Sequence, residues 1–204
     1  MSEKNLLVIF TRNPELGKVK TRLAKGIGDQ SALDIYKILL DHTVSVTKKG
    51  NCKKSVWYSE KVRQNDIWDN SLYTKHLQKG NDLGERMEHA FTYGFANGYE
   101  KIVIIGSDLY DLREEHLAQA FGYLDHYNAV IGPAKDGGYY LLGLNTMIAP
   151  VFRNKKWGKD TVLKDTLKDL KSLKIKLLEE LNDIDYVEDI QVYDIFKPFI
   201  NHTN

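Results

Sequence analysis

The charged side chains best placed to bind a ligand follow the first apolar run of the chain. Arg12, Lys18, Lys20 and Arg22 oppose a single acid, Glu15, so this loop carries a local charge of +3. Open α/β sheets bind ligands where a central strand ends, and a helix start adds free N–H donors for an anion. The loop therefore predicts a phosphate site, with a solvated basic loop as the alternative. Neither a P-loop nor a GxGxxG motif is present, so the motifs support neither an ATPase nor a dehydrogenase.

A carboxylate follows the second strongly apolar run in the same way. Asp108 comes directly after this run, and Gly106 permits close backbone approach there. Mg²⁺ and Mn²⁺ take oxygen ligands and keep waters and substrate phosphates, so one or two carboxylates suffice to hold either ion. We expect Asp108 to bind such a metal. We expect Asp111 to cap the next helix instead, in a capping box with Glu114.

A glycine-rich turn carries a third candidate group. Gly137 and Gly138 let backbone amides approach a ligand, between Asp136 and the aromatic ring of Tyr139. Asp-Gly is also a strong hairpin signal. Turn chemistry alone favours an ordinary hairpin, which is compatible with a ligand site.

The last acidic cluster precedes the final predicted helix. Asp185 and Glu188 have the spacing of a capping box, and Asp185 is also a candidate second metal ligand. No histidine pair has the HxxxH spacing of a zinc helix, and no Gly-x-Ser-x-Gly motif is present. The pattern therefore favours a carboxylate-bound hard cation over zinc or a serine nucleophile.

The elements expected to position these groups alternate between short apolar runs and longer segments of helical period. This alternation predicts a three-layer α/β/α sandwich with a mostly parallel sheet. Residues 6–10 and 102–105 are apolar on both faces, as expected for central strands covered on each side. Further strands are expected at 55–59, 72–77, 129–131, 139–144 and 175–178. Helices are expected at 32–48, 83–97, 114–124 and 161–172, and after residue 185.

Length and composition restrict the class of protein. A chain of 204 residues, 42% of them hydrophobic, is long enough for one sizeable core, and we expect residues 1–204 to form a single domain. The formal charge of +1 gives no overall field for nucleic acid or an acidic membrane. The lone Cys52 excludes an internal disulfide, and the first apolar run is too short for a signal peptide, so we expect a cytoplasmic protein. Trp57, Trp68 and Trp157, if exposed, would mark a homodimer surface.

Five segments follow one another along nearly the whole chain. They are Lys20-Thr21-Arg22-Leu23, Asp82-Leu83-Gly84-Glu85-Arg86-Met87, Gly106-Ser107-Asp108, Gly132-Pro133-Ala134-Lys135-Asp136-Gly137-Gly138-Tyr139 and Asp183-Ile184-Asp185. Together they resemble a family of uncharacterised bacterial glycosyltransferase-like proteins associated with radical-SAM or selenium genes. This family is similar to the GT-A nucleotide-diphospho-sugar transferase fold. Its nearest characterised relatives in pattern look like the 2-phospholactate guanylyltransferases and molybdenum cofactor guanylyltransferases, which bind a nucleotide and Mg²⁺.

The resemblance implies which residues bind the donor. It implies that Arg12, Lys20 and Arg22 hold phosphates and that Leu83 and Gly84 lie near the base or ribose. We expect the ligands to be a nucleotide or nucleotide-sugar donor and a small-molecule acceptor, with no nucleic acid or membrane partner.

The same resemblance implies that Asp108 binds Mg²⁺ or Mn²⁺ and that Asp185 supplies the second carboxylate. One position departs from the pattern. Relatives carry Pro two residues after the metal aspartate, where this chain has Tyr110. The turn that aims Asp108 is therefore expected to differ. Trp157 is a further, weaker candidate for the second substrate.

The turn residues Gly137, Gly138 and Tyr139 are implied to face the second substrate, with Asp136 as a catalytic residue beside Asp108. Three functions remain open. A glycosyltransferase would use Asp136 to orient or deprotonate an acceptor hydroxyl. A guanylyltransferase-like nucleotidyltransferase would transfer a nucleotidyl group to a small phosphorylated substrate by positioning and charge neutralisation. A catalytically silent nucleotide-binding protein would retain the fold without the reaction.

Overall fold

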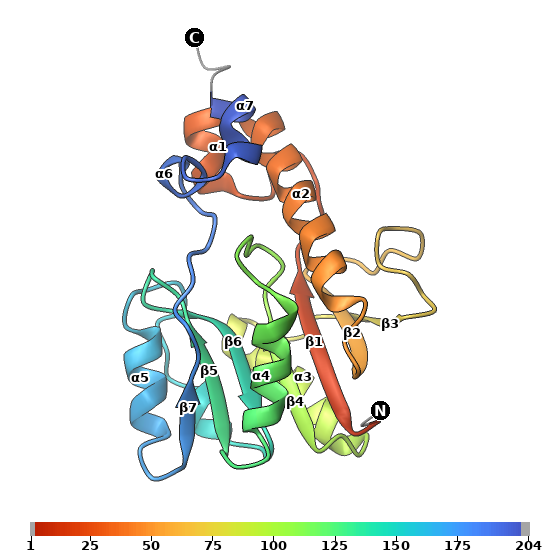
Figure 1. The fold of residues 1–204 in the computed structure, drawn as a ribbon, viewed down its shortest axis with the longest axis vertical. Helices are drawn as coiled ribbons and strands as arrows, with labels where there is room; N and C mark the ends of the chain where they lie inside the picture. Colours follow the sequence, from red (N-terminus) through yellow and green to blue (C-terminus); the bar gives the residue numbers. More distant parts are fainter. Residues whose placement is uncertain (1–2, 201–204) are drawn as a thin grey trace.

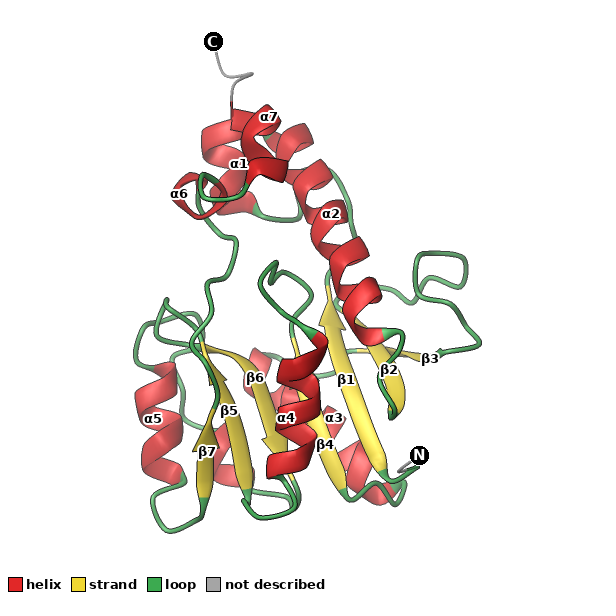
Figure 2. Cartoon of the chain, viewed as in Figure 1, coloured by secondary structure: helices red, strands yellow, loops and turns green. Residues whose placement is uncertain are grey.

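The computed structural model describes residues 3–200, and its centre is one seven-stranded sheet. The strand order is β3-β2-β1-β4-β6-β5-β7, and only β6 runs antiparallel to its neighbours. The predicted three-layer α/β/α class with a mostly parallel sheet is confirmed (Figures 1 and 2). The strands are β1 (Asn5–Thr11), β2 (Lys53–Tyr58), β3 (Tyr73–Leu77), β4 (Lys101–Ile105), β5 (Ala129–Pro133), β6 (Tyr139–Leu144) and β7 (Ile175–Leu177).

The strand order reverses between β1 and β4. From β1 the chain moves outward to β2 and β3, then returns to place β4 on the other side of β1, in parallel register from Asn5–Lys101 to Ile9–Ile105. Open α/β sheets bind ligands in the crevice at the carboxyl ends of strands that flank such a reversal. The loops that begin at Arg12 and Gly106 leave the sheet at this point.

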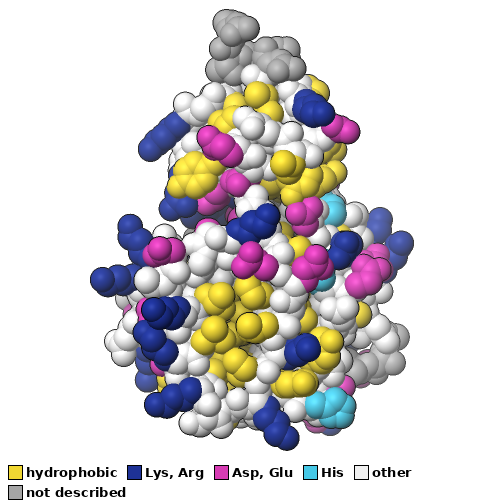
Figure 3. All heavy atoms as spheres, turned by 60° about the vertical axis from the view of Figure 1, so that its left-hand side comes forward, with side chains coloured by type: hydrophobic (Ala, Val, Ile, Leu, Met, Phe, Trp, Pro, Cys, Tyr) yellow, Lys and Arg dark blue, Asp and Glu magenta, His cyan; other side chains and the backbone are white. Residues whose placement is uncertain are grey.

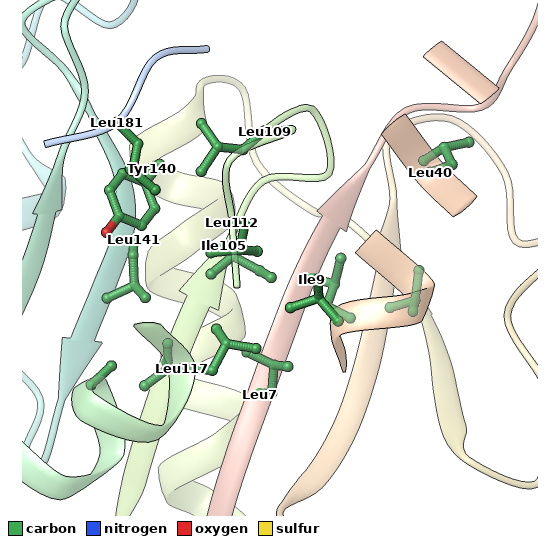
Figure 4. Packing of buried hydrophobic residues seen from close by; sticks show 14 of the residues in the cluster. Leu7, Ile9, Leu40, Ile105, Leu109, Leu112, Leu117, Tyr140, Leu141 and Leu181 are labelled. Carbon is green, nitrogen blue, oxygen red and sulfur yellow. The ribbon is translucent and has the colours of Figure 1, made fainter. Parts of the chain in front are cut away.

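Helices α2 (Asp29–Thr47) and α4 (Glu114–Tyr123) cover one face of the sheet. The strand period of two directs Leu7 and Ile9 of β1 to this face, where they pack with Leu40 and Leu117 of the two helices (Figure 4). These side chains are almost fully buried. The layer therefore supports the ends of β1 and β4 from this side.

The other face is covered by α3 (Leu83–Ala96), α5 (Val162–Asp169) and the 3₁₀ helix η1 (Ala149–Phe152). Leu6 and Val8, which alternate with the β1 residues of the first face, contact this layer together with Met87 and Phe91 of α3. The predicted apolar stripe of the 83–97 helix is therefore part of the core, as expected for an amphipathic helix.

A group of helices lies beyond the carboxyl ends of the strands, and we call it the helical cap (Figure 1). It consists of α1 (Thr21–Ile27), the first half of α2, α6 (Val187–Ile190), the 3₁₀ helix η2 (Asp194–Phe196) and α7 (Lys197–Ile200). Leu23, Ile35, Ile184 and Phe196 form its own apolar core. The first and last parts of the described chain thus meet above the sheet.

Most of the predicted elements are present, and the differences lie in the cap. The sequence did not predict α1, because its seven residues include Gly26 and are too few for a clear helical period. Trp57 and Trp68 are buried at 1% and 2% exposure, so the predicted dimer surface on these two residues is wrong. Trp57 packs in the α3 layer and Trp68 against Tyr73. Within residues 3–200, no helix is both long and apolar enough to cross a membrane.

Candidate functional site

Lys20 occupies the centre of the candidate site. Its ammonium group donates to Asp108 Oδ2 at 2.8 Å and to Asp185 Oδ1 at 3.0 Å, and only 5% of the side chain is exposed. The Lys20 backbone has φ 46° and ψ 43°, the left-handed conformation that is uncommon for residues other than glycine. Such strain is often found at functional sites, where surrounding contacts hold it. The strained residue is the N-cap of α1, and its ammonium group contacts Asp108 in the loop after β4.

Arg22 adds a second cation on the outer side of this cluster. Its guanidinium donates to Asp185 Oδ2 at 3.0 Å, and half of its side chain is exposed. The Arg22 guanidinium also lies over the ring of Tyr186, 5.7 Å from its centre. Asp185 therefore lies between two cations of the cap, and each of its two carboxylate oxygens accepts a hydrogen bond from one of them.

The segment that carries the last acids runs along the end of β5 towards Asp108. Leu181 donates its backbone N–H to Pro133, and the Lys135 N–H donates to Leu181. The Ile184 N–H then donates to the Asp108 carbonyl at 3.5 Å. These contacts place Asp183 and Asp185 beside the loop after β4.

A buried network of hydroxyl groups joins the ends of β1 and β4. Tyr36 of α2 lies 3.3 Å from Thr11 Oγ1 and 3.1 Å from Ser107 Oγ, and its oxygen accepts the Arg12 backbone N–H at 2.9 Å. The sequence showed Tyr36 only as a member of a core stripe, because its helical spacing does not reveal a polar role for the hydroxyl. The network fixes the positions from which Arg12 and Asp108 leave the sheet.

Asp108 is ionised and accessible. Burial acts to raise the pKa of Asp108, but the charge and hydrogen bond of Lys20, aided by the Arg12 guanidinium, hold that pKa below its usual value. The Asp108 side chain remains 43% exposed. A Cβ atom at position 106 would lie 2.9 Å from Asp108 Oδ1, so Gly106 leaves room for this carboxylate.

The Lys20 ammonium is fixed in its charged state. Burial acts to lower the pKa of Lys20, but Asp108 and then Asp185 raise it well above the usual range. The cluster thus holds a permanent cation between two carboxylates.

Asp183 has a different ionisation state, which sequence reasoning did not find. Burial and then the charge of Asp108 raise the pKa of Asp183 to about 8, with Asp136 and Asp185 adding to the shift and Lys20 opposing it. Within the part of the chain that the structure describes, Lys20 pairs with Asp108 and Asp185 but not with Asp183. The Asp-x-Asp spacing of Asp183 and Asp185 was the available signal.

The acid of the loop after β1, Glu15, pairs with one cation of that loop and with two cations of the segment after β2. Glu15 forms ion pairs with Lys18, Lys61 and Arg63 at 2.9–3.0 Å. Hydrogen bonds from Lys61, Lys18 and Arg63, in that order, lower the pKa of Glu15 to about 2. Arg12 is exposed, and the described residues include no ion-pair partner for it. Arg12 is therefore the guanidinium of this loop that is open to an incoming anion.

The glycine-rich turn joins β5 and β6 in the predicted hairpin. Asp136 Oδ1 accepts the Gly138 N–H at 2.8 Å, which leaves Asp136 Oδ2 outside this bond, and the side chain is exposed. Gly137 has φ 85°, and a Cβ atom there would lie 2.3 Å from the Asp160 carbonyl oxygen. Tyr139 is half-buried, and its hydroxyl group approaches Met87 Sδ at 4.0 Å. The charge of Asp136 acts on Asp183, so the turn borders the acidic cluster.

The predicted base or ribose residues lie at the start of α3. Asp82 caps this helix by accepting the Glu85 N–H, and Leu83 is 43% exposed. Gly84 is buried, and a Cβ atom there would lie 2.0 Å from the Phe152 carbonyl oxygen and 2.7 Å from the Trp157 ring. Gly84 and Trp157 therefore pack against each other. Leu83 is the member of the predicted pair whose side chain a ligand can reach.

Both predicted capping boxes are wrong. Arg113, not Asp111, is the N-cap of α4, and Asp111 accepts a hydrogen bond from Tyr193 at 2.6 Å. At α6, Asp189 accepts the backbone N–H groups of Asp185 and Tyr186, so the Asp185 side chain is left for Lys20 and Arg22. In both cases a tertiary contact outweighs the local capping pattern.

Tyr110, which stands where the resemblance has Pro, anchors the loop of Asp108 to the cap. Its ring packs against His42, Tyr193 and Phe196, with ring centres 4.9–5.1 Å apart. Tyr110, which replaces the Pro of the family pattern, thus forms an aromatic contact between the sheet edge and the C-terminal helices.

The protein side chains alone do not form a complete metal site. Within residues 3–200, no group of three or more His, Cys, Asp or Glu side chains is arranged to hold a metal ion. The Lys20 ammonium lies between Asp108 and Asp185. Asp108 and Asp183 still offer oxygen atoms, and a hard cation can complete its shell with waters and substrate phosphates.

The sheet order, the single antiparallel strand and the acidic edge define a nucleotide-diphospho-sugar transferase-like fold. A proposed nucleotide-diphospho-sugar transferase from Desulfovibrio desulfuricans G20 is 31% identical and superposes with a TM-score of 0.85, covering 98% of this chain and 90% of that chain. A 4-diphosphocytidyl-2C-methyl-D-erythritol synthase from Anaerococcus prevotii DSM 20548 is 13% identical, with a TM-score of 0.57 over 92% of this chain and 93% of its own.

An inositol-1-phosphate CTP transferase from T. maritima is also 13% identical, with a TM-score of 0.54 over 98% of this chain and 96% of its own. These two distant structures share the fold. The family profile of uncharacterized proteins conserved in bacteria, DUF2064, matches residues 42–159, and the chain belongs to this family. No curated protein matches the sequence. The matched region includes Asp108 and the Asp136 turn but not Lys20 or Asp185.

Proposed function

We propose that this protein is a metal-dependent transferase that uses a nucleotide-activated donor. The observation that carries the proposal is the joining of Lys20, Asp108 and Asp185, from three distant parts of the chain, at the carboxyl edge where the strand order reverses. Ligands of α/β sheets bind at such a reversal. The 31% identical relative, described as a nucleotide-diphospho-sugar transferase, supports a donor of this class.

Asp108 is the residue proposed to hold Mg²⁺ or Mn²⁺, with Asp183 beside it. Asp185 is proposed as the second carboxylate, which requires that Lys20 or Arg22 release one of its oxygens when the donor phosphates bind. The fit rests on Asp108, which is 43% exposed and has a lowered pKa, and on Asp183 beside it. The pKa of Asp183 is raised first by burial and then by the charge of Asp108, and a divalent cation would offset that charge. Donor phosphates and waters would complete the shell of a metal held there. A metal here supplies charge neutralisation for a diphosphate.

Three cations are proposed to bind the donor phosphates. Arg12 is exposed and free of ion pairs among the described residues, whereas Arg22 is paired but half exposed. Lys20 is buried between the carboxylates and acts as a fixed positive charge at the centre. Preorganised charges of this kind stabilise the negative charge that develops on a departing phosphate.

For glycosyl transfer, Asp136 is proposed as the base. Its Oδ1 is fixed by the Gly138 N–H, and the remaining carboxylate oxygen faces outward on an exposed turn. Asp136 takes the proton of an acceptor hydroxyl as the acceptor oxygen bonds to the sugar carbon, and the nucleoside diphosphate departs with the electrons of the broken bond. Gly137, Gly138 and Tyr139 border the proposed acceptor position.

Nucleotidyl transfer is the second candidate. Arg12, Lys20 and Arg22 come from one segment of eleven residues and would bind the phosphates of a nucleoside triphosphate in the same way. A phosphate oxygen of the second substrate then attacks the α-phosphorus, and pyrophosphate leaves. No protein base is needed for that step, because the attacking phosphate is already ionised.

Product analysis separates the two reactions. The purified protein would be incubated with Mg²⁺ or Mn²⁺ and either nucleotide sugars or nucleoside triphosphates, each with mixed small acceptors. Release of a nucleoside diphosphate from a nucleotide sugar identifies glycosyl transfer, and release of pyrophosphate identifies nucleotidyl transfer. Metal-dependent nucleotide binding without either product would instead identify a catalytically silent protein and reject the proposed activity.

A further inference from the structure

A shallow recess of about 520 Å³ lies along the outer face of α5, apart from the ion-paired residues of the site. Its floor consists of Leu163 and Leu167, and its rim carries Lys164, Lys168 and Lys171. The two leucines, Lys164 and Lys168 recur at spacings of three and four along α5, so they share one side of the helix, and Lys171 lies in the turn that follows α5. The surface within the recess is mainly apolar, and the recess is open to solvent.

The recess begins at the glycine-rich turn. Gly137 lines one end of it, and the Leu163 N–H donates to the Gly137 carbonyl oxygen at 2.9 Å. The Asp160 carbonyl oxygen approaches Gly137 so closely that a Cβ atom there would lie 2.3 Å away. The start of α5 is thus fixed to the turn that carries Asp136. A molecule lying in the recess would reach this turn with one end.

The recess is positively charged. Its lining contains three lysines and one aspartate, a net charge of +2. It belongs to a stretch, residues 153–176, that has nine Lys or Arg and three Asp side chains. Figure 3 shows basic side chains grouped along the side of the molecule that carries α5. Lys168 pairs with Asp165 at 2.7 Å, whereas Lys164 and Lys171 have no ion-pair partner among the described residues. Two exposed ammonium groups therefore remain for an anionic ligand.

We propose that this recess binds the acceptor of the reaction and that the acceptor is a small anionic amphiphile, with an apolar body on Leu163 and Leu167 and an anionic group at Lys164 and Lys171. The inference rests on the proposed transferase function, because it takes the Asp136 turn as the acceptor side. Burial of the apolar body provides most of the affinity. The exposed lysines add little affinity each but favour an anion over an uncharged molecule.

The shape of the recess favours a single small molecule over a membrane surface. Leu163 and Leu167 are half-buried against the α3–α5 core layer, and the lysines of the rim are more exposed than they are. A helix that lies in a bilayer interface must instead project its apolar side chains into the lipid. Two recessed leucines between lysines suit a molecule that enters the recess.

Matched amphiphiles test the proposal by titration calorimetry below their micelle concentrations. Octyl phosphate, octyl glucoside and octyltrimethylammonium share the same chain and differ in the charge of the head group. We expect the wild-type protein to bind octyl phosphate at least about tenfold more tightly than either of the others. The double variant Lys164→Glu, Lys171→Glu is expected to lose this preference. The control variant Lys48→Glu, Lys49→Glu has the same change in net charge at two exposed residues after α2, and should retain it.

Three results would overturn the proposal. These are equal affinity for the three amphiphiles, an unchanged preference in the Lys164→Glu, Lys171→Glu variant, and binding to anionic phospholipid vesicles without binding to monomeric octyl phosphate. If charge reversal prevents folding, Lys164→Gln with Lys171→Gln replaces it, with the same expected loss.

A second readout separates this inference from the proposed function. Nucleotide with Mg²⁺ should raise the melting temperature of the Lys164→Glu, Lys171→Glu variant as much as that of the wild type, because the donor residues are untouched. Selective octyl phosphate binding by a wild-type protein that binds no nucleotide would reject the transferase function and also the assignment of the bound molecule as its acceptor.

Discussion

The two sides of the site are built in different ways. On the donor side, Lys20 contacts Asp108 and Asp185, which are 88 and 165 residues away in sequence. On the acceptor side, Asp136 contacts Gly138 two residues away, and the Ala134 N–H and the Gly137 N–H close the same turn. The donor side therefore forms only when the cap closes over the sheet. The bonds that close the turn are local, and its long-range contacts are backbone contacts with the start of α5 and with Leu181.

This difference has a consequence for how each side responds to mutation. Each charge on the donor side compensates another, so removing one leaves its partner without compensation, which is costly for buried groups. The turn carries one carboxylate on an exposed surface, so a change there should alter a chemical step and leave the fold intact. Variants of the donor side should therefore lose stability as well as activity, whereas variants of the turn should lose activity alone.

The largest expected effect is that of Asp108→Asn. Loss of the proposed metal carboxylate should lower kcat/KM by about 1,000-fold, because charge on the departing phosphate is no longer neutralised. Steady-state kinetics at saturating Mg²⁺ measures the loss. Asp111→Asn, three residues away, is the control and should stay within a few fold of the wild type, since Asp111 contacts Tyr193 and not the cluster. Equal losses in the two variants would reject the separate role of Asp108.

Lys20→Met tests the central cation of the donor side. The expected loss in kcat/KM is between about 100-fold and 1,000-fold, the range for removal of a preorganised electrostatic group. Stability should also fall, by less than the roughly 3–5 kcal/mol typical of fully buried pairs, because both carboxylates are partly exposed. Urea unfolding measures that change. Lys18→Met alters an exposed lysine of the same loop, and a comparable loss there would show that overall loop charge, not Lys20, is responsible.

On the acceptor side, Asp136→Asn should lower kcat of a glycosyl reaction by about 100-fold, the lower end of the range for a general base. The asparagine carbonyl oxygen can still accept the Gly138 N–H, so the turn should persist. Metal-dependent nucleotide affinity, measured by calorimetry, should be unchanged. A loss of nucleotide affinity equal to the loss in kcat would place Asp136 on the donor side and remove the distinction between the two sides.

The smallest effect is a pH dependence of stability at Asp183. The pKa of Asp183 is about 8 in the fold, against the ordinary aspartate value of 3.8, so between these pH values the folded state holds a proton that the unfolded state lacks. The stability associated with this proton is complete below pH 4 and is lost as the pH rises to about 8. Asp183→Asn should therefore raise the melting temperature of the metal-free protein more at pH 8.5 than at pH 5. The same increase at both pH values would contradict the raised pKa.

The same contrast explains what the sequence could and could not reveal. The Asp136–Gly138 hairpin and the apolar runs of β1 and β4 follow from local residue patterns, and they were predicted. The ion pairs of Lys20 depend on the closure of the cap by α1 and α6, and no local pattern contains that information. The capping-box spacing at Asp111 also gave a wrong prediction, because Asp111 accepts a tertiary hydrogen bond from Tyr193 instead of capping α4.

Aromatic residues show the same limit. Trp57 and Trp68 were named as candidates for an exposed dimer surface, yet both lie in the core. The helical spacing of Tyr36 identified it as buried but could not show that its hydroxyl joins Thr11 and Ser107. Burial follows from sequence periodicity more readily than the partners of a buried polar atom do.

The most direct test of the donor side is nucleotide binding with and without metal, measured by calorimetry on the wild type and on Asp108→Asn. We expect a nucleoside diphosphate to bind the wild type at least about tenfold more tightly with Mg²⁺ or Mn²⁺ than with a chelator, and this metal dependence to be absent in Asp108→Asn. Full metal dependence in the variant, or no nucleotide binding by the wild type under any of these conditions, would contradict the proposed function.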